Sequence, residues 1–505
     1  MEKVIRRALV SVYHKEGLAE ILKLLHEQGV EFVSTGGTST FIEGLGYPCV
    51  AVEDLTKYPS MLGGRVKTLH PAIQGGILAR RGHETDQKEV LEYGLSLIDL
   101  VIVDLYPFEA TVASGASEED IIEKIDIGGI SLIRGAAKNF EDVVIIPSQA
   151  DYATLLEILR ERGARTTIEE RRHFARRAFA VSSHYDSAIF RYFDAEDHSA
   201  LRLTADEAKP LRYGENPHQK GVFYGDLDRY FEQLHGKELS YNNLQDVEAA
   251  VSLIQDFSEP TFAILKHNNA CGCASRPTLL EAWTDALAGD PVSAFGGVLV
   301  ANRPIDVATA REIDKLFLEV LIAPDFEAEA LTILEGKKNR ILLRQKEAID
   351  ARWSYRSMLG GVLAQETDRA VETTAEMKPV TKVAPTAEEL TDLVFATKLV
   401  KHSKSNAIVL SKGGQLIASG VGQTSRVDAL KQAIEKARHF GFDLKGAVLA
   451  SDAFFPFDDC VTLAAEAGIT AIAQPGGSVR DADSIAAADR LGIAMVMTGV
   501  RHFKH

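Results

Sequence analysis

The sequence contains few cysteines and no long apolar run. Among its 505 residues are four cysteines, of which only Cys271 and Cys273 lie close together. This spacing predicts no disulfide framework and favours a reducing compartment. The most apolar stretch, residues 95–108, is interrupted by Asp99 and Asp104 and is too short to span a bilayer. Since the first residues also lack a secretory signal pattern, we expect a cytoplasmic protein.

Positive charge is also scarce. The chain has 56 Lys and Arg residues against 72 Asp and Glu residues, a formal net charge of −16. Such a field repels nucleic acid and anionic membranes, so we expect neither as a partner and expect small-molecule substrates instead. The length predicts about three compact units at roughly 150 residues each. An apolar content of 46% is sufficient for a large buried core.

The first 150 residues alternate between short β-branched runs and helix-like segments. Strands are expected at residues 8–12, 31–35, 98–105 and 143–146, and helices at 18–28 and 38–45. This alternation predicts an α/β fold with a parallel sheet flanked by helices. Residues 151–193 have a wholly helical pattern with a solvated basic face that includes Arg171, and the acidic stretch 194–209 is the expected domain boundary.

Beyond this boundary the α/β alternation resumes. Thr386 and Glu389 form a capping box that opens a helix, and Gly413-Gly414 predicts a hairpin. Strands are expected at residues 261–265, 293–300, 407–410, 415–420, 447–450, 471–473 and 494–497. Because helix and strand units recur on both sides of residue 360, this half is predicted to form two similar layers.

Two glycine-containing loops concentrate anion-binding groups in the first 150 residues. One is Gly63-Gly-Arg-Val-Lys-Thr-Leu-His-Pro71, and the other is Ser34-Thr-Gly-Gly-Thr38, between a strand and a helix. Glycine lets the backbone approach an oxyanion, and a helix N-terminus with Arg and Lys nearby supplies positive potential. Neither loop matches a Walker or dinucleotide fingerprint, and each alone is more typical of an ordinary turn. Together they indicate a phosphomonoester site.

Two further motifs follow in the same unit: Asp104-Leu-Tyr-Pro-Phe108 and Asp126-Ile-Gly-Gly129. Tyr106 follows a buried strand, and ligands of open α/β sheets bind at the carboxyl ends of strands. A tyrosine at that position is also a common packing residue. The motif therefore supports a ligand site without proving one.

The run Leu265-Lys-His-Asn-Asn269 is the most suggestive motif of the second half. A Lys and a His at the end of an apolar strand are costly as core residues, so we expect both to face a cleft, with His267 as a proton acceptor and Lys266 stabilising negative charge. His267, Cys271 and Cys273 are a candidate zinc set. The Cys-x-Cys spacing lacks a second half, and no metal is expected.

Two loops of the second half carry further candidate ligand groups. Arg212-Tyr-Gly-Glu-Asn-Pro-His-Gln219 is typical of a polar ligand-binding turn or of a plain tight turn. Ser451-Asp-Ala-Phe-Phe-Pro-Phe-Asp-Asp459 is predicted to expose Phe454, Phe455 and Phe457. These rings could hold a flat heteroaromatic ligand, or could equally be core aromatics under a loop.

Taken in order, these motifs resemble the bifunctional AICAR formyltransferase/IMP cyclohydrolase family, over essentially the whole chain to Arg501-His-Phe-Lys-His505. The resemblance implies a methylglyoxal-synthase-like cyclohydrolase domain at residues 1–150 and a helical connector at 151–198. It also implies a formyltransferase region of two cytidine-deaminase-like subdomains at 199–505, without the deaminase zinc. The implied reactions are formyl transfer from 10-formyltetrahydrofolate to AICAR, giving FAICAR, and dehydrative ring closure of FAICAR to IMP.

The resemblance also implies site residues. For ring closure the catalytic set is Lys67, Tyr106, Asp126 and Lys138, and the substrate-binding set is Ser11, Lys15, Ser34, Gly37, Thr38, Arg65 and Thr68. For formyl transfer the catalytic set is Lys266, His267 and Asn406, and the nucleotide-binding set is Arg212, Tyr213, Asn243, Glu319 and Arg501. The folate-facing set is Phe454, Phe457 and Asp459. The resemblance further implies a homodimer whose formyltransferase sites share residues between chains.

Two segments depart from the family pattern, and two other functions stay open. Ser11-Val-Tyr-His-Lys15 stands where the family has Ser-Val-Ser-Asp-Lys, and Ala270 stands where it has Pro. The alternatives are a zinc-dependent nucleoside deaminase, for which the chain lacks the His-x-Glu and Pro-Cys-x-x-Cys signatures, and a non-catalytic nucleotide sensor that would leave 10-formyltetrahydrofolate unchanged.

Overall fold

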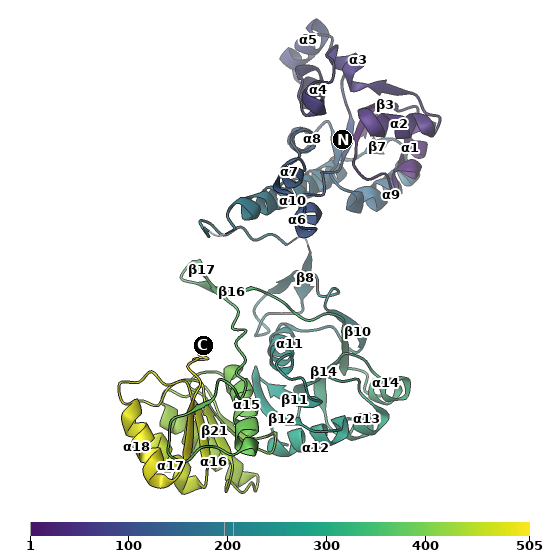
Figure 1. Ribbon diagram of the computed structural model, residues 1–505. Coiled ribbons are helices and arrows are strands. Elements are labelled where there is room, and N and C mark those ends of the chain that lie inside the picture. Colours follow the sequence, from purple (N-terminus) through teal and green to yellow (C-terminus); the bar gives the residue numbers. More distant parts are fainter. Residues whose placement is uncertain (1, 196, 206) are drawn as a thin grey trace. The chain divides into compact units, whose positions relative to one another are not determined.

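A computed structural model describes residues 2–195, 197–205 and 207–505 and divides the chain into two units, residues 1–206 and 207–505 (Figure 1). The division falls inside the acidic stretch 194–209, of which Glu196 and Asp206 lie outside the described residues. Each unit has its own hydrophobic core.

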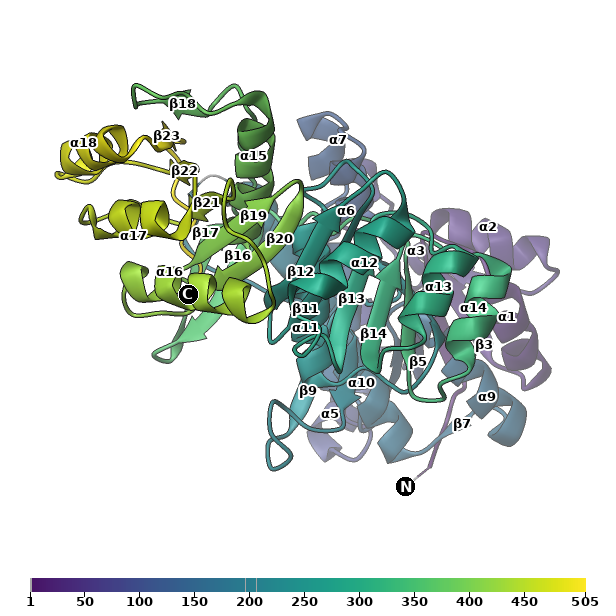
Figure 2. The same ribbon diagram turned by 90° about the horizontal axis from the view of Figure 1, so that it is seen from below.

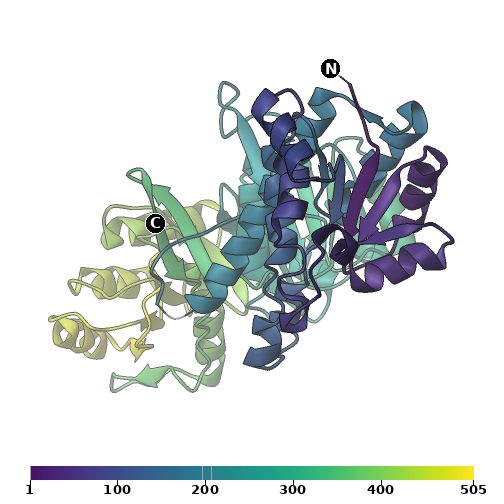
Figure 3. The ribbon, with the colours of Figure 1, turned by 90° about the horizontal axis from the view of Figure 1, so that it is seen from above.

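The first unit is built on a five-stranded parallel sheet with the order β4-β3-β2-β5-β6. Helices lie on both sides of these strands (Figure 3). The strands are β1 (Lys3–Val4), β2 (Arg7–Ser11), β3 (Glu31–Ser34), β4 (Cys49–Ala51), β5 (Leu100–Val103), β6 (Val144–Ile146) and β7 (Arg165–Thr166). The helices are α1 (Leu18–Glu27), α2 (Gly36–Gly44), α3 (Val52–Thr56), η1 (Leu62–Gly64), α4 (Pro71–Leu78), α5 (Glu84–Glu92), α6 (Phe108–Ala113), α7 (Glu118–Ile122), α8 (Gly128–Lys138), η2 (Gln149–Asp151), α9 (Tyr152–Arg162) and α10 (Ile168–Phe193).

The strand order creates a switch point between β2 and β5. From β2 the chain adds β3 and β4 on one side, and then crosses to add β5 and β6 on the other. The loops that leave β2 and β5 therefore diverge, which opens a crevice at the carboxyl edge where ligands of such sheets bind. The fold thus places the residues after Ser11 and after Val103 at the expected ligand position.

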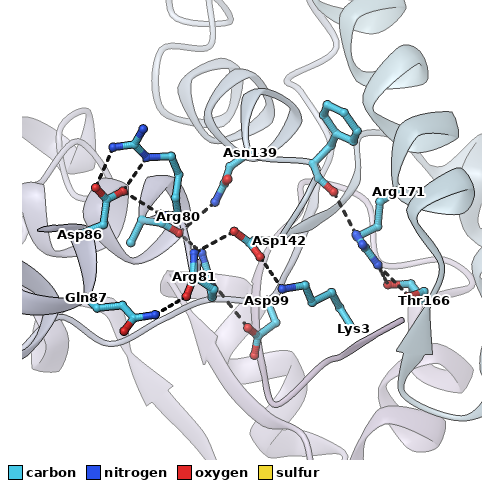
Figure 4. A network of polar contacts seen from close by, with 12 residues as sticks. Lys3, Arg80, Arg81, Asp86, Gln87, Asp99, Asn139, Asp142, Thr166 and Arg171 are labelled. Carbon is cyan, nitrogen blue, oxygen red and sulfur yellow. Dashed lines mark hydrogen bonds and ion pairs between the residues drawn. The ribbon is translucent and has the colours of Figure 1, made fainter. Parts of the chain in front are cut away.

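A polar network closes the opposite edge of this sheet (Figure 4). The Arg81 guanidinium donates to the carbonyls of Ala79 and Ile98, each at 2.6 Å, and the Arg81 backbone N–H donates to Asp142 at 2.9 Å. Lys3 pairs with the same Asp142 at 2.7 Å. Because these groups tie the loops before β5 and β6 to one another, this edge is structural.

Two predictions for residues 151–193 are wrong. The segment is not wholly helical, because β7 separates α9 from α10 and pairs with β1. Arg171 does not belong to a solvated face: it is buried and donates to the carbonyls of Phe140 (2.9 Å) and Thr166 (2.7 Å), which satisfies its charge-bearing donors inside the protein (Figure 4). The segment is packed within the first unit, since α9 contacts α1 and α10 contacts α8.

The second unit contains one mixed sheet of twelve strands, ordered β10-β15-β14-β13-β11-β12-β20-β19-β21-β22-β23-β18. Its strands, with two separate hairpins, are β8 (Ala208–Leu211), β9 (Gly221–Tyr224), β10 (Phe231–His235), β11 (Thr261–Lys266), β12 (Asn269–Ser275), β13 (Gly297–Ala301), β14 (Leu318–Ala323), β15 (Ile341–Gln345), β16 (Trp353–Met358), β17 (Gly361–Glu366), β18 (Lys378–Pro379), β19 (Ile408–Lys412), β20 (Gln415–Gly420), β21 (Val448–Ser451), β22 (Ala471–Gln474) and β23 (Ala494–Met497). The helices are α11 (Tyr241–Ile254), α12 (Leu279–Gly289), α13 (Val307–Ile313), α14 (Ala328–Glu335), α15 (Ala387–Lys401), α16 (Arg426–His439), α17 (Asp459–Ala467) and α18 (Asp481–Leu491).

This sheet consists of two repeats of the same element order. α11, the β11–β12 hairpin and three helix–strand pairs ending in β15 are followed by α15, the β19–β20 hairpin and three helix–strand pairs ending in β23. α11 and α15 pack on one face of the sheet, and α12–α14 with α16–α18 pack on the other (Figure 2). The predicted two similar layers thus join edge to edge, where β12 pairs with β20.

Two local predictions for this unit are wrong. The strand expected at 293–300 begins only at Gly297, because residues 293–296 form a turn in which Gly296 has φ +68°. Phe455 is buried, with its backbone N–H donating to Gln474 at 2.9 Å, whereas Phe454 and Phe457 are exposed. In the part of the chain that the structure describes, no helix is long and apolar enough to cross a membrane.

Candidate active sites

The loops after β2 and β5 meet at the switch point of the first unit. The Asp104 carboxylate accepts hydrogen bonds from the backbone N–H groups of Tyr13 and His14 and pairs with the His14 ring Nδ1 at 2.9 Å. Lys15 turns back to donate to the carbonyls of Val12 (2.5 Å) and Tyr13 (2.9 Å). Asp104 therefore fixes the segment that follows Ser11 at the edge of the crevice.

Tyr106 and Asp126 lie together beside this loop. Burial raises the pKa of Asp126, whose Oδ1 accepts a hydrogen bond from the Gly129 backbone at 2.6 Å. Burial, and then the Asp126 charge, raise the pKa of Tyr106. The Tyr106 ring meets Tyr13 edge to face, with centroids 5.6 Å apart. At neutral pH the tyrosine keeps its proton, so this corner offers a phenol donor next to a carboxyl group that can exchange a proton.

The Ser34–Thr38 loop offers backbone donors to an anion, and the Lys67 ammonium lies close to this loop. The Ser34 hydroxyl donates to the Val10 carbonyl at 2.6 Å, and the Thr38 hydroxyl donates to the Val12 carbonyl at 3.0 Å, so both fasten the loop to β2. A Cβ added to Gly36 would lie 3.4 Å from Lys67 Nζ, which places the ammonium close to the N-terminus of α2. Gly36 and Gly37 follow at this terminus, where N–H groups favour negative charge.

The remaining candidates of the first unit fall into two groups. Thr68 contacts the start of α8, since its hydroxyl would lie 2.7 Å from a Cβ on Gly128, and exposed Arg65 pairs with Glu123. Lys138 is the last residue of α8. At a rise of 1.5 Å per residue it lies about 15 Å along the helix from Gly128, in a separate hollow with Ser131 and Arg134.

The candidates for the second activity gather at one edge of the twelve-stranded sheet. β11 ends at Lys266, beside the starts of β13 and β14, and Glu319 is the second residue of β14. β19 begins two residues after Asn406, and its first residue pairs with Ser451 at the end of β21. The Lys404 backbone N–H donates to the Asn269 side chain at 3.1 Å, which joins the two repeats at this edge.

His267 and Asn268 form the two-residue turn between β11 and β12. Both have positive φ, +50° and +65°, as a tight hairpin turn requires, and such angles are strained for residues other than glycine. The Asn268 backbone N–H donates to Asp246 of α11 at 2.7 Å, and the Lys266 ammonium donates to the carbonyls of Phe295 and Gly296 at 2.9 Å. The structure thus holds the His267 turn and the Lys266 ammonium in fixed positions.

Asn406 is oriented by a buried ion pair. Arg426 Nη2 donates to the side-chain Oδ1 of Asn406 at 2.7 Å, and Arg426 Nη1 pairs with Asp452. The Asn406 amide nitrogen donates to the Gln423 carbonyl at 3.0 Å. Asp452 is fully buried, and its second carboxylate oxygen has no hydrogen-bond partner among the described residues.

The other candidates surround this edge with less direct geometry. Arg212 stacks on Tyr213, and the loop that follows is joined to α11 because Asn242 donates to the Glu215 carbonyl at 3.2 Å. Asn243 is buried, and its side chain caps α11 through Ser240. Glu319 pairs with Lys237 at 2.6 Å.

The predicted folate-facing residues do not share one environment. The Arg480 guanidinium lies over the exposed Phe457 ring at 5.1 Å, and Phe454 is also exposed. Asp459 is the first residue of α17 and accepts from the Cys460 backbone at 2.8 Å. Cys271 and Cys273 are buried, which raises the pKa of both thiols and disfavours the thiolate that a metal requires. The described residues contain no group of three or more His, Cys, Asp or Glu side chains placed to hold a metal ion.

Comparison with known proteins decides the family. Residues 136–436 match the model of the AICARFT/IMPCHase bienzyme, and residues 17–131 match that of the MGS-like domain. Over 503 residues the chain is 67% identical to the bifunctional purine biosynthesis protein PurH of Bacteroides thetaiotaomicron, with 100% of this chain and 99% of that protein covered. The chain belongs to the AICARFT/IMPCHase bienzyme family. PurH proteins of Chloroflexus aurantiacus and Chlorobium luteolum are 48% and 47% identical over 100% of this chain and 99% and 100% of their own lengths.

Membership in this family confirms the predicted function and fold class. The chain is a bifunctional enzyme with AICAR formyltransferase and IMP cyclohydrolase activities, and its first unit contains an MGS-like domain. The deaminase and sensor alternatives are therefore dropped.

Sequence reasoning missed four residues that the structure places beside the candidate residues of the second unit. Asp246 holds the His267 turn, Arg426 and Asp452 orient Asn406, and His502 anchors the C-terminal tail. Asp452 stands inside the Ser-Asp-Ala-Phe-Phe motif, so its position after a buried strand was an available signal. Arg426 is the first residue of α16 and lies on the same face as the buried Ala429, Leu430 and Ala433, so the helical spacing was an available signal for its burial.

Proposed function

We propose that the first unit closes FAICAR to IMP and that the second unit transfers the formyl group of 10-formyltetrahydrofolate to AICAR, as successive steps of purine biosynthesis. The observation that carries this assignment is the separation of the candidates into two clusters. One lies at the switch point of the sheet in the first unit, and the other lies at one edge of the twelve-stranded sheet in the second unit. Cluster one contains Tyr106, Asp126 and Lys67, and cluster two contains Lys266, His267 and Asn406.

In formyl transfer the AICAR amine attacks the formyl carbon, the bond from that carbon to the tetrahydrofolate nitrogen breaks, and the departing nitrogen takes up a proton. His267 takes the proton of the attacking amine, because Asp246 holds its turn in place and imidazole is the commonest general base in enzymes. Lys266 and the Asn406 amide stabilise negative charge that develops on the formyl oxygen. Arg212, Tyr213, Asn243, Glu319 and Arg501 bind the nucleotide, and Phe454, Phe457 and Asp459 face the folate.

In ring closure the carboxamide nitrogen of FAICAR attacks its own formyl carbon, and water is lost. Proximity provides much of the rate because the step is intramolecular. Lys67 and Tyr106 donate to the formyl oxygen, and Asp126, whose pKa burial raises, exchanges a proton with the attacking nitrogen. Ser11, Lys15, Ser34, Gly37, Thr38, Arg65 and Thr68 bind the nucleotide, while Lys138 supports α8 from its last turn.

We also propose that the enzyme is a cytoplasmic homodimer that needs no metal. The β16–β17 hairpin supports a dimer, because Tyr355, Leu359, Val362 and Leu363 on it are exposed and an isolated two-stranded hairpin is barely stable in water. A second copy of the chain that covers these residues would bury them.

The full-length enzyme tests the assignment. AICAR and 10-formyltetrahydrofolate should yield IMP without added metal. Lys67→Ala should let FAICAR accumulate, and His267→Ala should abolish formyl transfer while cyclisation of supplied FAICAR continues. A variant that loses both steps equally would contradict the division. For the dimer, sedimentation should give twice the chain mass, and Leu359→Asp should shift it toward the monomer.

A further inference from the structure

The last five residues of the chain are held by one buried side chain. Residues 501–505 form neither helix nor strand, and within them only His502 is buried. Its ring lies between two carboxylates, with Nδ1 2.6 Å from Asp368 and Nε2 2.8 Å from Glu372. Because both ring nitrogens face acceptors, the ring carries two protons and a positive charge.

The same tail passes along the edge of the twelve-stranded sheet that carries Lys266, His267 and Asn406, called the formyl-transfer edge below. The His502 backbone N–H donates to the Asp452 carbonyl at 3.0 Å. The Lys504 backbone N–H donates to the Ser405 hydroxyl at 3.0 Å, and the Ser405 backbone N–H donates to the Lys504 carbonyl at 2.9 Å. These bonds tie the tail to the residue before Asn406 and to the carboxylate residue that orients Arg426.

We propose that His502 is a positioning residue for formyl transfer: clamped as a cation between Asp368 and Glu372, it fixes the C-terminal tail so that Arg501 and the backbone around Asn406 keep their places. The inference rests on the proposed location of formyl transfer at this edge. Arg501 and Phe503 are exposed, with a contact of 4.5 Å between the Arg501 guanidinium and the Phe503 ring. A chain end without its buried anchor frays, so the clamp is what orders Arg501.

The charge state agrees with this role. Burial alone would lower the pKa of His502, but the hydrogen bonds and charges of Asp368 and Glu372 outweigh it and raise the pKa to about 9. Glu372 is itself buried, so each partner requires the other. Of the other charged groups, Lys401 at the end of α15 lies near Asp368 and pairs with Asp256 at 3.0 Å. Lys504 of the tail lies near Lys401, Glu248 and His402.

The test uses the full-length enzyme with His502→Gln, which keeps a similar size and removes the cation. We expect the KM for AICAR in formyl transfer to rise at least tenfold, with a smaller change in kcat, because Arg501 loses its position. Cyclisation of supplied FAICAR should stay within twofold. His439→Gln, an exposed histidine at the end of α16, is the matched control and should change neither step.

A second variant and a pH profile keep the proposal falsifiable if His502→Gln folds poorly. Asp368 is about half exposed, so Asp368→Asn should fold and give a weaker form of the same rise in KM. In the wild type the KM for AICAR should rise as pH passes 9, and this rise should be smaller in His502→Gln, which lacks the imidazole ring. Wild-type KM values and pH profiles in both variants would overturn the proposal. A wild-type enzyme without formyl transfer, or a fully active His267→Ala, would instead overturn the proposed function.

Discussion

Arg426 is expected to be the residue of the formyl-transfer edge whose charge matters most for both stability and activity. Its guanidinium pairs with the fully buried Asp452, donates to the Ser451 hydroxyl at 2.9 Å and holds the Asn406 oxygen at 2.7 Å. Arg426→Met keeps much of the apolar volume and removes all of these donors. The substitution therefore leaves a buried carboxylate without its counter-charge.

The expected magnitude follows from that carboxylate. Removing one partner of a buried ion pair costs about 3–5 kcal/mol, and Asp452 has no alternative donor on its second oxygen among the described residues. Domains are stable by about 5–15 kcal/mol, so the second unit should remain folded but near its limit. Because Asn406 loses a hydrogen bond to a charged donor, we expect the rate of formyl transfer to fall at least about tenfold, which corresponds to about 1.4 kcal/mol in the activation free energy.

Urea unfolding followed by tryptophan fluorescence measures this loss selectively. Both tryptophans of the chain, Trp283 and Trp353, lie in the second unit. Arg438→Met, an exposed change on the same helix α16, is the matched control and should stay within about 0.5 kcal/mol. Adding Asp452→Asn to Arg426→Met should restore part of the stability, since the unpaired charge is removed. A loss below about 1 kcal/mol in Arg426→Met, or an equal fall in cyclisation, would refute the reasoning.

Three further outcomes are expected. Gly272→Ala should destabilise the second unit by about 2–3 kcal/mol in urea, because the new Cβ would lie 2.0 Å from the Ala286 carbonyl oxygen and backbone must shift. The second unit should lose about 2 kcal/mol of its unfolding free energy between pH 6.5 and 9, measured by urea unfolding at each pH. The folded pKa of His502, about 9, exceeds the usual value near 6.5, so the stabilisation by this histidine is complete below pH 6.5 and is lost as pH passes 9. The full effect would be ~3 kcal/mol, but solvent screens part of it at half-exposed Asp368. Lys138→Ala should cyclise supplied FAICAR at least tenfold faster than Lys67→Ala does, since α8 holds Lys138 about 15 Å from Gly128.

Local sequence patterns predicted strand and helix positions well where one period dominates. The strands at β2, β3 and β11 and the capping box at Thr386 agree with the structure within a residue or two, because burial and capping at these sites depend on neighbours in sequence. The predicted exposure of Arg171 and Phe455 was wrong because the burial of these residues depends on distant partners, the Phe140 carbonyl and Gln474. No periodicity within a helix or loop encodes such contacts.

The candidate sites show the same division between local and distant information. Gly36 and Gly37 at a helix start, and Lys266 and His267 at a strand end, could be selected from sequence because the chemistry lies within one motif. The hold of Asp246 on the His267 turn and of Arg426 on Asn406 spans 20 or more positions. These contacts appear only when the sheet brings the segments together.

The repeat organisation of the second unit explains why the candidate groups for formyl transfer come from both repeats of its sheet. In each repeat the strand that follows the hairpin pairs antiparallel with the first strand of that hairpin. The segments β11–β12–β13 and β19–β20–β21 therefore have the same arrangement. The repeats use different ends of that arrangement: the first contributes the tip of its hairpin, at His267, and the second contributes the chain entering its hairpin, at Asn406. Pairing of β12 with β20 brings these ends to one edge, and the Asn269–Lys404 bond fixes them there. In the proposed assignment, one repeat alone supplies either the base or the amide, and the pairing of the two repeats lets both act on one bound nucleotide.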